Sequence, residues 1–363
     1  MSALGLGLDL SLGGRRVGDA GNMPAKFTVT SGDGTAYIRV KVSETTTVTP
    51  AGGTSIRIGT TGEFVTTPLT LVANTDQDIY FKDAGSFTIP RRKLVTYLRL
   101  DSLGSSVITG DITGMKLTTL YLSSLGSSVI TGKITGMKLT YLYLTGIGSS
   151  VITGDITGMK LTYLLLYALG SSVITGDITG MKLTYLFLAG IGSSVITGDI
   201  TGMKLTSLLL SNIGSSVIRG NITGMELTDL YLRSLGSSVI EGEITGMELI
   251  RLYLYGIGSS LSYGTNLLNI TNSLGIQLLG STVFATAAEY ERLIHEAATG
   301  TWGGKYPFTI TTGTNDNCPD WDTVKADVAT LLTKAAWTII PSAWLYDNGG
   351  SWPADWDEYT GEE

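Results

Sequence analysis

The stretch GSSVITGDITGMKLTYLLLYAL, residues 148–169, returns with few changes every 22 residues through the middle of the chain. A glycine opens each of eight copies: Gly104, Gly126, Gly148, Gly170, Gly192, Gly214, Gly236 and Gly258. A fixed period of about 20–29 residues that contains L-x-x-L-x-L is typical of leucine-rich-repeat solenoids. The repeat therefore predicts a mainly β solenoid over residues 94–280, in which each 22-residue copy forms one coil.

The same period predicts which side chains point inward. In the middle coils these are Leu139, Leu142, Leu144, Ile147, Ile152, Ile156 and Met159. One coil cannot bury such a face alone, so neighbouring coils must stack on it. Because a coil has no helix-length segment, we expect a flat β solenoid whose strands lie about 4.8 Å apart.

Non-repeated segments flank the solenoid. Residues 26–93 contain six short runs rich in β-branched and aromatic residues, separated by turns such as GDG and PAGG, and predict a small β-sandwich domain. Residues 281–346 alternate helical and strand patterns, beginning with a helix after Thr286, and predict an α/β cap over the end of the core. Residues 1–25 are interpreted as an attachment arm, and residues 347–363 as an acidic, tryptophan-containing tail.

Composition excludes several classes of function. The net charge is −7 and no cluster of Lys or Arg occurs, which argues against a nucleic-acid partner. Cys318 and His295 are the only cysteine and histidine, so a catalytic triad or a metal site has few residues to draw on. No apolar run approaches about 18 residues, so we expect no membrane insertion. The start of the chain lacks the pattern of an export signal. We expect no enzymatic activity, no metal and no cofactor.

The copies differ mainly at the positions that flank the inward leucines, which we expect on one outward face. The candidate ligand-binding residues there are Tyr141, Tyr143, Tyr163, Tyr167, Tyr185, Phe187, Tyr231, Arg233, Arg251 and Tyr253. An exposed aromatic patch usually marks a contact surface, and flat rings suit the C–H faces of sugars. The same rings could instead form ladders that only stabilise the stacked strands.

Charged columns mark the opposite side of the coils. One column contains Asp111, Lys133, Asp155, Asp177, Asp199, Asn221 and Glu243. The other contains Lys116, Lys138, Lys160, Lys182, Lys204, Glu226 and Glu248. We expect a solvated face whose opposite charges offset one another, because a calcium site would need clustered carboxylates without lysines among them.

The LTYLYL…ITGDI coils, the Gly-rich start, the β segment ahead of the coils and LLTKAAWTI near the C-terminus carry a family resemblance. They resemble leucine-rich-repeat virion proteins of tailed bacteriophages that infect Bacteroidetes, crAss-like phages included. The resemblance implies a location on the exterior of the virion, attachment to other virion proteins through residues 1–25, and repeats that bind a host-surface or mucosal glycan or protein. We also expect a homo-oligomer.

Four interpretations of function remain open. The leading one is a non-enzymatic phage fibre or head-appendage protein. The second is a purely structural virion decoration protein, and the third is a bacterial cell-surface adhesin, which would need an export signal or an anchor. The fourth, a glycan depolymerase, would need two carboxylates about 5–9.5 Å apart. The outward face offers only Asp101 and Asp229, which lie five or six coils apart.

Overall fold

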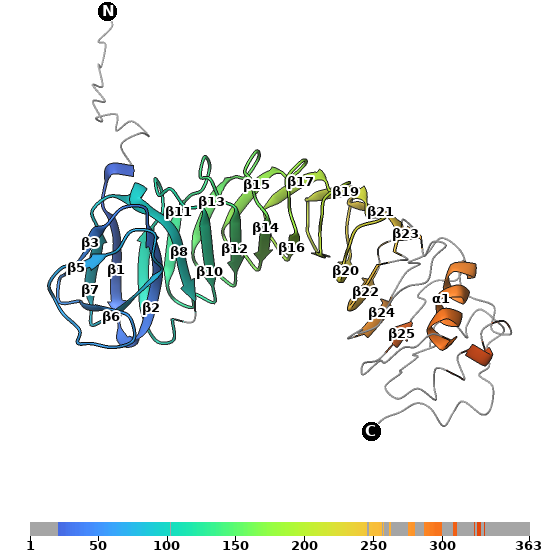
Figure 1. The fold of residues 1–363 in the computed structure, drawn as a ribbon, viewed down its shortest axis with the longest axis horizontal. Helices are drawn as coiled ribbons and strands as arrows, with labels where there is room; N and C mark the ends of the chain where they lie inside the picture. Colours follow the sequence, from blue (N-terminus) through green and yellow to red (C-terminus); the bar gives the residue numbers. More distant parts are fainter. Residues whose placement is uncertain are drawn as a thin grey trace, which may run out of the picture.

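The computed structural model describes residues 21–101, 103–244, 247–255, 257, 261–262, 275–279, 287–299 and 308–310, with residues 323, 325–327 and 330. Two stacked sheets run along an elongated solenoid (Figure 1). Strands hold 49% of the residues and helices 7%, and the coils repeat at about 22 residues. The prediction of a mainly β solenoid is confirmed.

Each coil contributes one strand to each of the two sheets. The L-x-L strands form the front sheet: β8 (Val95–Asp101), β10 (Thr119–Ser123), β12 (Tyr141–Thr145), β14 (Tyr163–Tyr167), β16 (Tyr185–Ala189), β18 (Ser207–Ser211), β20 (Asp229–Arg233) and β22 (Arg251–Tyr255). The returning strands form the back sheet: β9 (Val107–Asp111), β11 (Val129–Lys133), β13 (Val151–Asp155), β15 (Val173–Asp177), β17 (Val195–Asp199), β19 (Val217–Asn221), β21 (Val239–Glu243) and β23 (Leu261–Ser262). Neighbouring coil strands pair in parallel within both sheets.

The core lies between the two sheets and follows the predicted pattern. Leu142, Leu164 and Leu186 lie directly opposite one another in the front sheet and are fully buried. Ile152 is fully buried on the returning side, and Met159, at the corner of the coil, is 8% exposed. Such a column buries apolar surface only because every coil has neighbours, so the stacking itself stabilises the fold.

In the seven GSS turns that the structure describes, the second serine is also buried. The Ser172 hydroxyl accepts a hydrogen bond from the Ile152 amide at 2.8 Å and donates one to the Ser150 carbonyl at 3.0 Å. Equivalent amide-to-serine bonds join Ile108 to Ser128, Ile130 to Ser150, Ile174 to Ser194, Ile196 to Ser216 and Ile218 to Ser238. This serine column pairs backbone groups that would otherwise be buried without partners. The repeat pattern did not indicate this role of the serine.

Seven strands precede the coils, one more than predicted. They are β1 (Ala25–Ser31), β2 (Asp33–Val42), β3 (Thr46–Ala51), β4 (Ser55–Ile58), β5 (Leu69–Leu71), β6 (Gln77–Lys82) and β7 (Gly85–Ile89). The sequence analysis missed β3, because Pro50 argues against a strand. Pro50 pairs with Phe87 of β7, while pairing with β5 ends at Val48. The proline therefore has a strand on only one side, where its missing N–H is tolerated.

These strands extend both sheets of the solenoid. β1 pairs with β9, where Phe27 faces Gly110, and β2 pairs with β8, where Val40 faces Leu98. Both pairings are antiparallel, in contrast to the parallel pairing of the coils. The boundary predicted between residues 93 and 94 thus falls where two continuous sheets run through it.

At the end of the predicted solenoid range, β24 (Gly275–Leu279) continues the front sheet by pairing in parallel with β22. In the predicted cap, β25 (Phe308–Ile310) pairs in parallel with β24. The helix α1 (Ala287–Thr299) occupies the stretch predicted as helical and buries Ile294 and Ala298. Residues 1–20 of the predicted arm, the second predicted cap helix in large part and the tail lie outside the described residues. Among the helices described, none is long and apolar enough to cross a membrane.

Candidate functional site

The outward side of the front sheet carries the predicted site residues. The register puts Tyr141, Tyr163 and Tyr185 opposite one another in one column. Tyr143 and Phe187 lie in the next column, on either side of Leu165. Successive residues of a strand point to opposite faces, so the buried leucines between these positions leave the aromatic side chains facing outward.

The tyrosine rings of this face stack on one another. The ring centroids of Tyr141 and Tyr163 lie 4.2 Å apart at an interplanar angle of 13°, and those of Tyr163 and Tyr185 lie 4.3 Å apart at 4°. Two further pairs are similar: Tyr121 with Tyr143 at 4.1 Å and Tyr231 with Tyr253 at 4.2 Å. Within these stacks the ring faces are occupied by neighbouring rings, so the stacked tyrosines offer edges and hydroxyls rather than faces to a ligand.

Burial raises the pKa of two phenols on this face. Burial, together with a hydrogen bond to Tyr121, raises the pKa of Tyr143 to about 12. Burial also raises the pKa of Tyr163 well above its usual range, with contributions from Tyr185 and Tyr141. The hydroxyls therefore stay protonated at neutral pH, where they can both donate and accept hydrogen bonds.

The structure divides the predicted site residues into two groups. Six lie on β12, β14 and β16: Tyr141, Tyr143, Tyr163, Tyr167, Tyr185 and Phe187. Tyr167 is the most exposed of these, at 47%, and meets Phe187 edge-on with centroids 6.0 Å apart. The others lie on β20 and β22, beyond β18, whose outward residues are Ser207, Leu209 and Ser211: Tyr231, Arg233, Arg251 and Tyr253. Arg233 is exposed, whereas the side chain of Arg251 lies outside the described residues.

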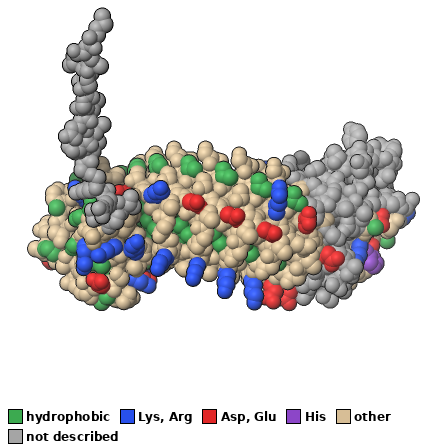
Figure 2. Space-filling model, turned by 90° about the horizontal axis from the view of Figure 1, so that it is seen from above, with side chains coloured by type: hydrophobic (Ala, Val, Ile, Leu, Met, Phe, Trp, Pro, Cys, Tyr) green, Lys and Arg blue, Asp and Glu red, His purple; other side chains and the backbone are tan. Residues whose placement is uncertain are grey.

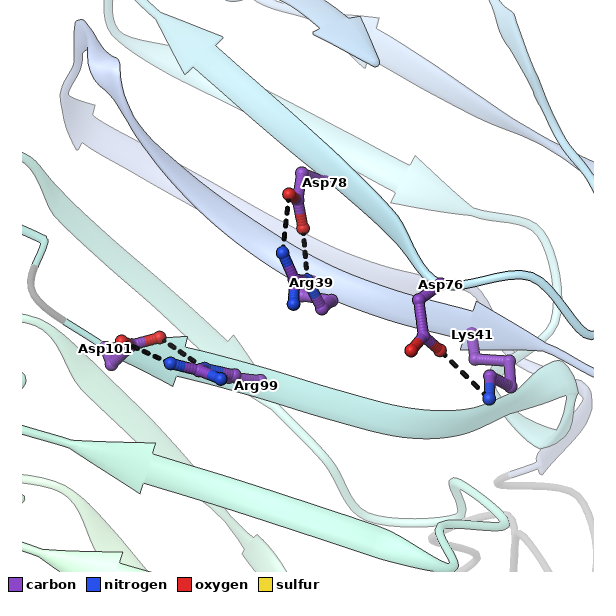
Figure 3. Close-up of polar contacts among 6 residues, drawn as sticks. All are labelled: Arg39, Lys41, Asp76, Asp78, Arg99 and Asp101. Carbon is purple, nitrogen blue, oxygen red and sulfur yellow. Dashed lines mark hydrogen bonds and ion pairs between the residues drawn. The ribbon is translucent and has the colours of Figure 1, made fainter. Parts of the chain in front are cut away.

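A network of charged residues on the same face was missed. Arg39 of β2 donates two hydrogen bonds to Asp78 of β6, at 2.6 and 2.8 Å, and Arg99 of β8 donates two to Asp101, at 2.8 and 3.0 Å (Figure 3). Arg39 and Arg99 lie directly opposite each other across the strands. The bonds to Asp78 and Asp101 raise the pKa of each arginine, so both remain charged.

Aromatic rings surround this network. The Arg57 guanidinium lies 4.7 Å from the ring centroid of Phe64 and 4.9 Å from that of Tyr80. The Arg99 guanidinium lies 4.7 Å from the ring centroid of Tyr121. The signal was present in TAYIRVKVS and DIYFK, where every second residue is aromatic or charged. That alternation marks one solvent-facing side of a half-buried strand.

The back of the coils shows the two predicted charged columns (Figure 2). The Asp177 carboxylate accepts a hydrogen bond from the Thr179 amide at 2.8 Å. The Asn221 side-chain oxygen accepts the equivalent bond from the Thr223 amide, also at 2.8 Å. The bonds to the Thr179 hydroxyl and amide lower the pKa of Asp177. No ion pair joins the two columns within the described residues, so local turn bonds, rather than the lysines, hold the aspartates.

No group of three or more potential metal ligands gathers in the described part of the chain. The only histidine, His295 of α1, is exposed and lies 2.9 Å from Asp327 through its Nδ1 atom.

Fold and geometry define the class of this protein as a β-solenoid of 22-residue leucine-rich coils, extended by antiparallel strands at its N-terminal end. No family model matches the chain, nor does any curated protein or solved structure.

Proposed function

We propose that this chain is a non-enzymatic recognition protein that binds a host-surface glycan or protein through the outward side of its front sheet. One observation carries the proposal: the scaffold is nearly constant, while the outward positions differ from coil to coil. The position of Tyr163, for example, holds Thr119, Ser207 and Asp229 in other coils. A ladder that only stabilised the strands would be served by one residue type throughout, whereas recognition needs different groups at different places.

We further propose that the protein acts on the exterior of a tailed-phage virion, as a fibre or head appendage. The support is the resemblance of the LTYLYL…ITGDI coils to virion proteins, together with the elongated shape of the solenoid (Figure 1). The outward residues vary from coil to coil along this length. In this proposal residues 1–25 attach the protein to other virion proteins, and several copies act together.

One observation favours the alternative of a structural decoration protein. The rings of Tyr141, Tyr163 and Tyr185 contact one another face to face. Such aromatic pairs contribute about 0.5–1.5 kcal/mol each beyond the area they bury. The middle of the tyrosine column therefore has a stabilising role that requires no ligand.

The test is the double variant Tyr143→Ser with Phe187→Ser, assayed for attachment to host cells and to printed oligosaccharides. We expect weaker attachment and only a modest fall in melting temperature, because both side chains lie outside the core. A matched control is Lys138→Ser with Lys182→Ser, two exposed side chains at the corners of the coils. If the aromatic double variant melts early but attaches as well as the unchanged protein, the column is structural and the recognition proposal is wrong.

A further inference from the structure

The first tyrosine column of the front sheet is interrupted at Thr119 and ends before Ser207. Its successive members lie directly opposite one another and are Tyr97, Thr119, Tyr141, Tyr163, Tyr185, Ser207 and Asp229. At Thr119 and Ser207 a small side chain stands where the coils between them carry a ring. Thr119 separates Tyr97 from Tyr141, whereas no ring follows Ser207, because the next member of the column is Asp229.

Ser207 and Thr119 differ in the contacts that their side chains make. Ser207 is only 7% exposed, and its hydroxyl donates a hydrogen bond to the Asp229 carboxylate at 3.2 Å. Asp229 also accepts a bond from the Thr228 hydroxyl at 3.1 Å, so the side chains of the next coil occupy this end of the column. Thr119 is half-buried, and its hydroxyl makes no hydrogen bond to any other described residue. Thr119 is therefore the position where the column leaves a gap and a hydroxyl that can bind a ligand.

Aromatic rings border the Thr119 gap on both sides. Tyr141 uses one ring face to stack on Tyr163 at 4.2 Å, and its other face is directed along the column toward Thr119. On the far side, Tyr97 has the Lys41 ammonium 5.9 Å from its ring centroid, on the strand away from Thr119. No ring contact joins Tyr97 to Tyr141 within the described residues.

The spacing of the column sets the width of this gap. Stacked rings in the column lie 4.2 Å apart, so two steps correspond to about 8.4 Å, and two strand spacings to about 9.6 Å. Carbon atoms pack best at about 3.5–4.0 Å, so a ring midway between the two tyrosines contacts both of them. The space is slightly wider than one flat ring requires, which suits the greater thickness of a puckered, saturated ring.

A pair of opposite charges lies one and two outward positions further along β8 than Tyr97. Arg99, opposite Tyr121 in the neighbouring column, forms its double hydrogen bond with Asp101, and both side chains remain partly exposed, at 32% and 18% (Figure 3). Donors and acceptors beside two ring faces match a molecule that has apolar C–H faces and a hydroxylated edge. Because these charges are already paired, they favour a neutral molecule over an anion.

We infer that the Thr119 gap is a sugar-binding subsite. Tyr97 and Tyr141 clamp one ring of a neutral saccharide between their faces. The Thr119 hydroxyl and the Arg99–Asp101 pair form hydrogen bonds with its hydroxyl groups. This inference rests on the proposed recognition function and specifies both the place of binding and the chemical class of the ligand.

The experiment fills the gap with the residue that the scaffold already accepts elsewhere. Thr119→Tyr completes the stack between Tyr97 and Tyr141, so the protein should fold, as circular dichroism and thermal melting would verify. The probe is a printed array of neutral and acidic oligosaccharides, followed by calorimetric titration of the best-bound neutral one. We expect Thr119→Tyr to weaken that affinity about tenfold or more. The matched control, Ser207→Tyr, adds a ring at the other end of the stack, next to Tyr185, and should bind like the unchanged protein.

A second variant, Tyr97→Ser, removes one of the two rings that border the gap and should also weaken binding of the neutral oligosaccharide. It tests the inference if Thr119→Tyr does not fold. The inference is wrong if both variants fold and bind as before while Tyr143→Ser with Phe187→Ser loses binding. That result would leave the proposed function standing. It is also wrong if the array selects acidic oligosaccharides only. If the unchanged protein binds neither oligosaccharides nor host cells, the proposed function itself fails.

Discussion

The buried serine column can be tested by replacing one serine in the middle of the solenoid. Ser172→Ala removes the acceptor of the Ile152 amide and the donor to the Ser150 carbonyl at a fully buried position. A buried amide without a partner costs about 1–3 kcal/mol, and a lost hydrogen bond about 0.5–1.5 kcal/mol. We expect a total loss of about 2–4 kcal/mol of unfolding free energy.

The assay is urea unfolding followed by circular dichroism, together with hydrogen exchange at the Ile152 amide. Hydrogen exchange is needed because a repeat protein can open locally around one coil. Ser171→Ala is the matched control: this neighbouring serine is exposed, and its replacement should change stability by less than about 0.5 kcal/mol. Equal stability of the two variants, with unchanged protection of the Ile152 amide, would refute the role assigned to the column.

Three further predictions concern the core, the back of the coils and the front face. Leu164→Ala should cost about 2–5 kcal/mol in urea unfolding because Leu164 is fully buried, and a loss near zero would contradict the packing. The lowered pKa of Asp177 means that its turn bond stabilises the fold above the ordinary aspartate pKa of about 3.9, and that this stabilisation is lost as the pH falls through the lowered value. Replacing Asp155, Asp177 and Asp199 together by Asn, which keeps this bond at position 221, should make melting temperatures less sensitive to acid; an unchanged sensitivity would count against the bond. The raised pKa of Tyr143, about 12, means that its neutral form stabilises the fold below the ordinary tyrosine pKa of about 10, and that this stabilisation is lost as the pH rises to about 12. Tyr143→Phe should remove one late-titrating phenol from the alkaline absorbance titration, and the reasoning fails if the late phase is unchanged.

The coils could be predicted from the sequence because the physics of a solenoid is local and repeated. Leu142, Leu164 and Leu186 occupy the same place in successive copies, so one period indicates both the inward face and the neighbours that cover it. The outward direction of Tyr141 and Tyr143 follows from the same alternation.

Contacts between distant segments could not be predicted in this way. Nothing in the repeat indicates that β1 pairs with β9 or that Arg39 of β2 lies opposite Arg99 of β8, because each contact depends on the register between separate parts of the chain. The hydrogen bond of Ser172 to the preceding coil depends on the path of the turn. The stacking of Tyr141 on Tyr163 depends on a ring spacing of 4.2 Å, which leaves no room for a ligand between the faces.

The antiparallel strands that begin both sheets have a consequence for how the chain finds its fold. Coils that are nearly identical can dock on one another out of step, since a shift by one whole coil preserves almost every inward contact. β1 and β2 carry non-repeated residues, and they pair with β9 and β8, the first strands of the two coil sheets. We expect this pairing to fix which copy becomes the first coil, and with it the position of every later coil in the stack. Deleting them would leave an assembly that can begin at any copy, and with it a mixture of shifted, shortened solenoids.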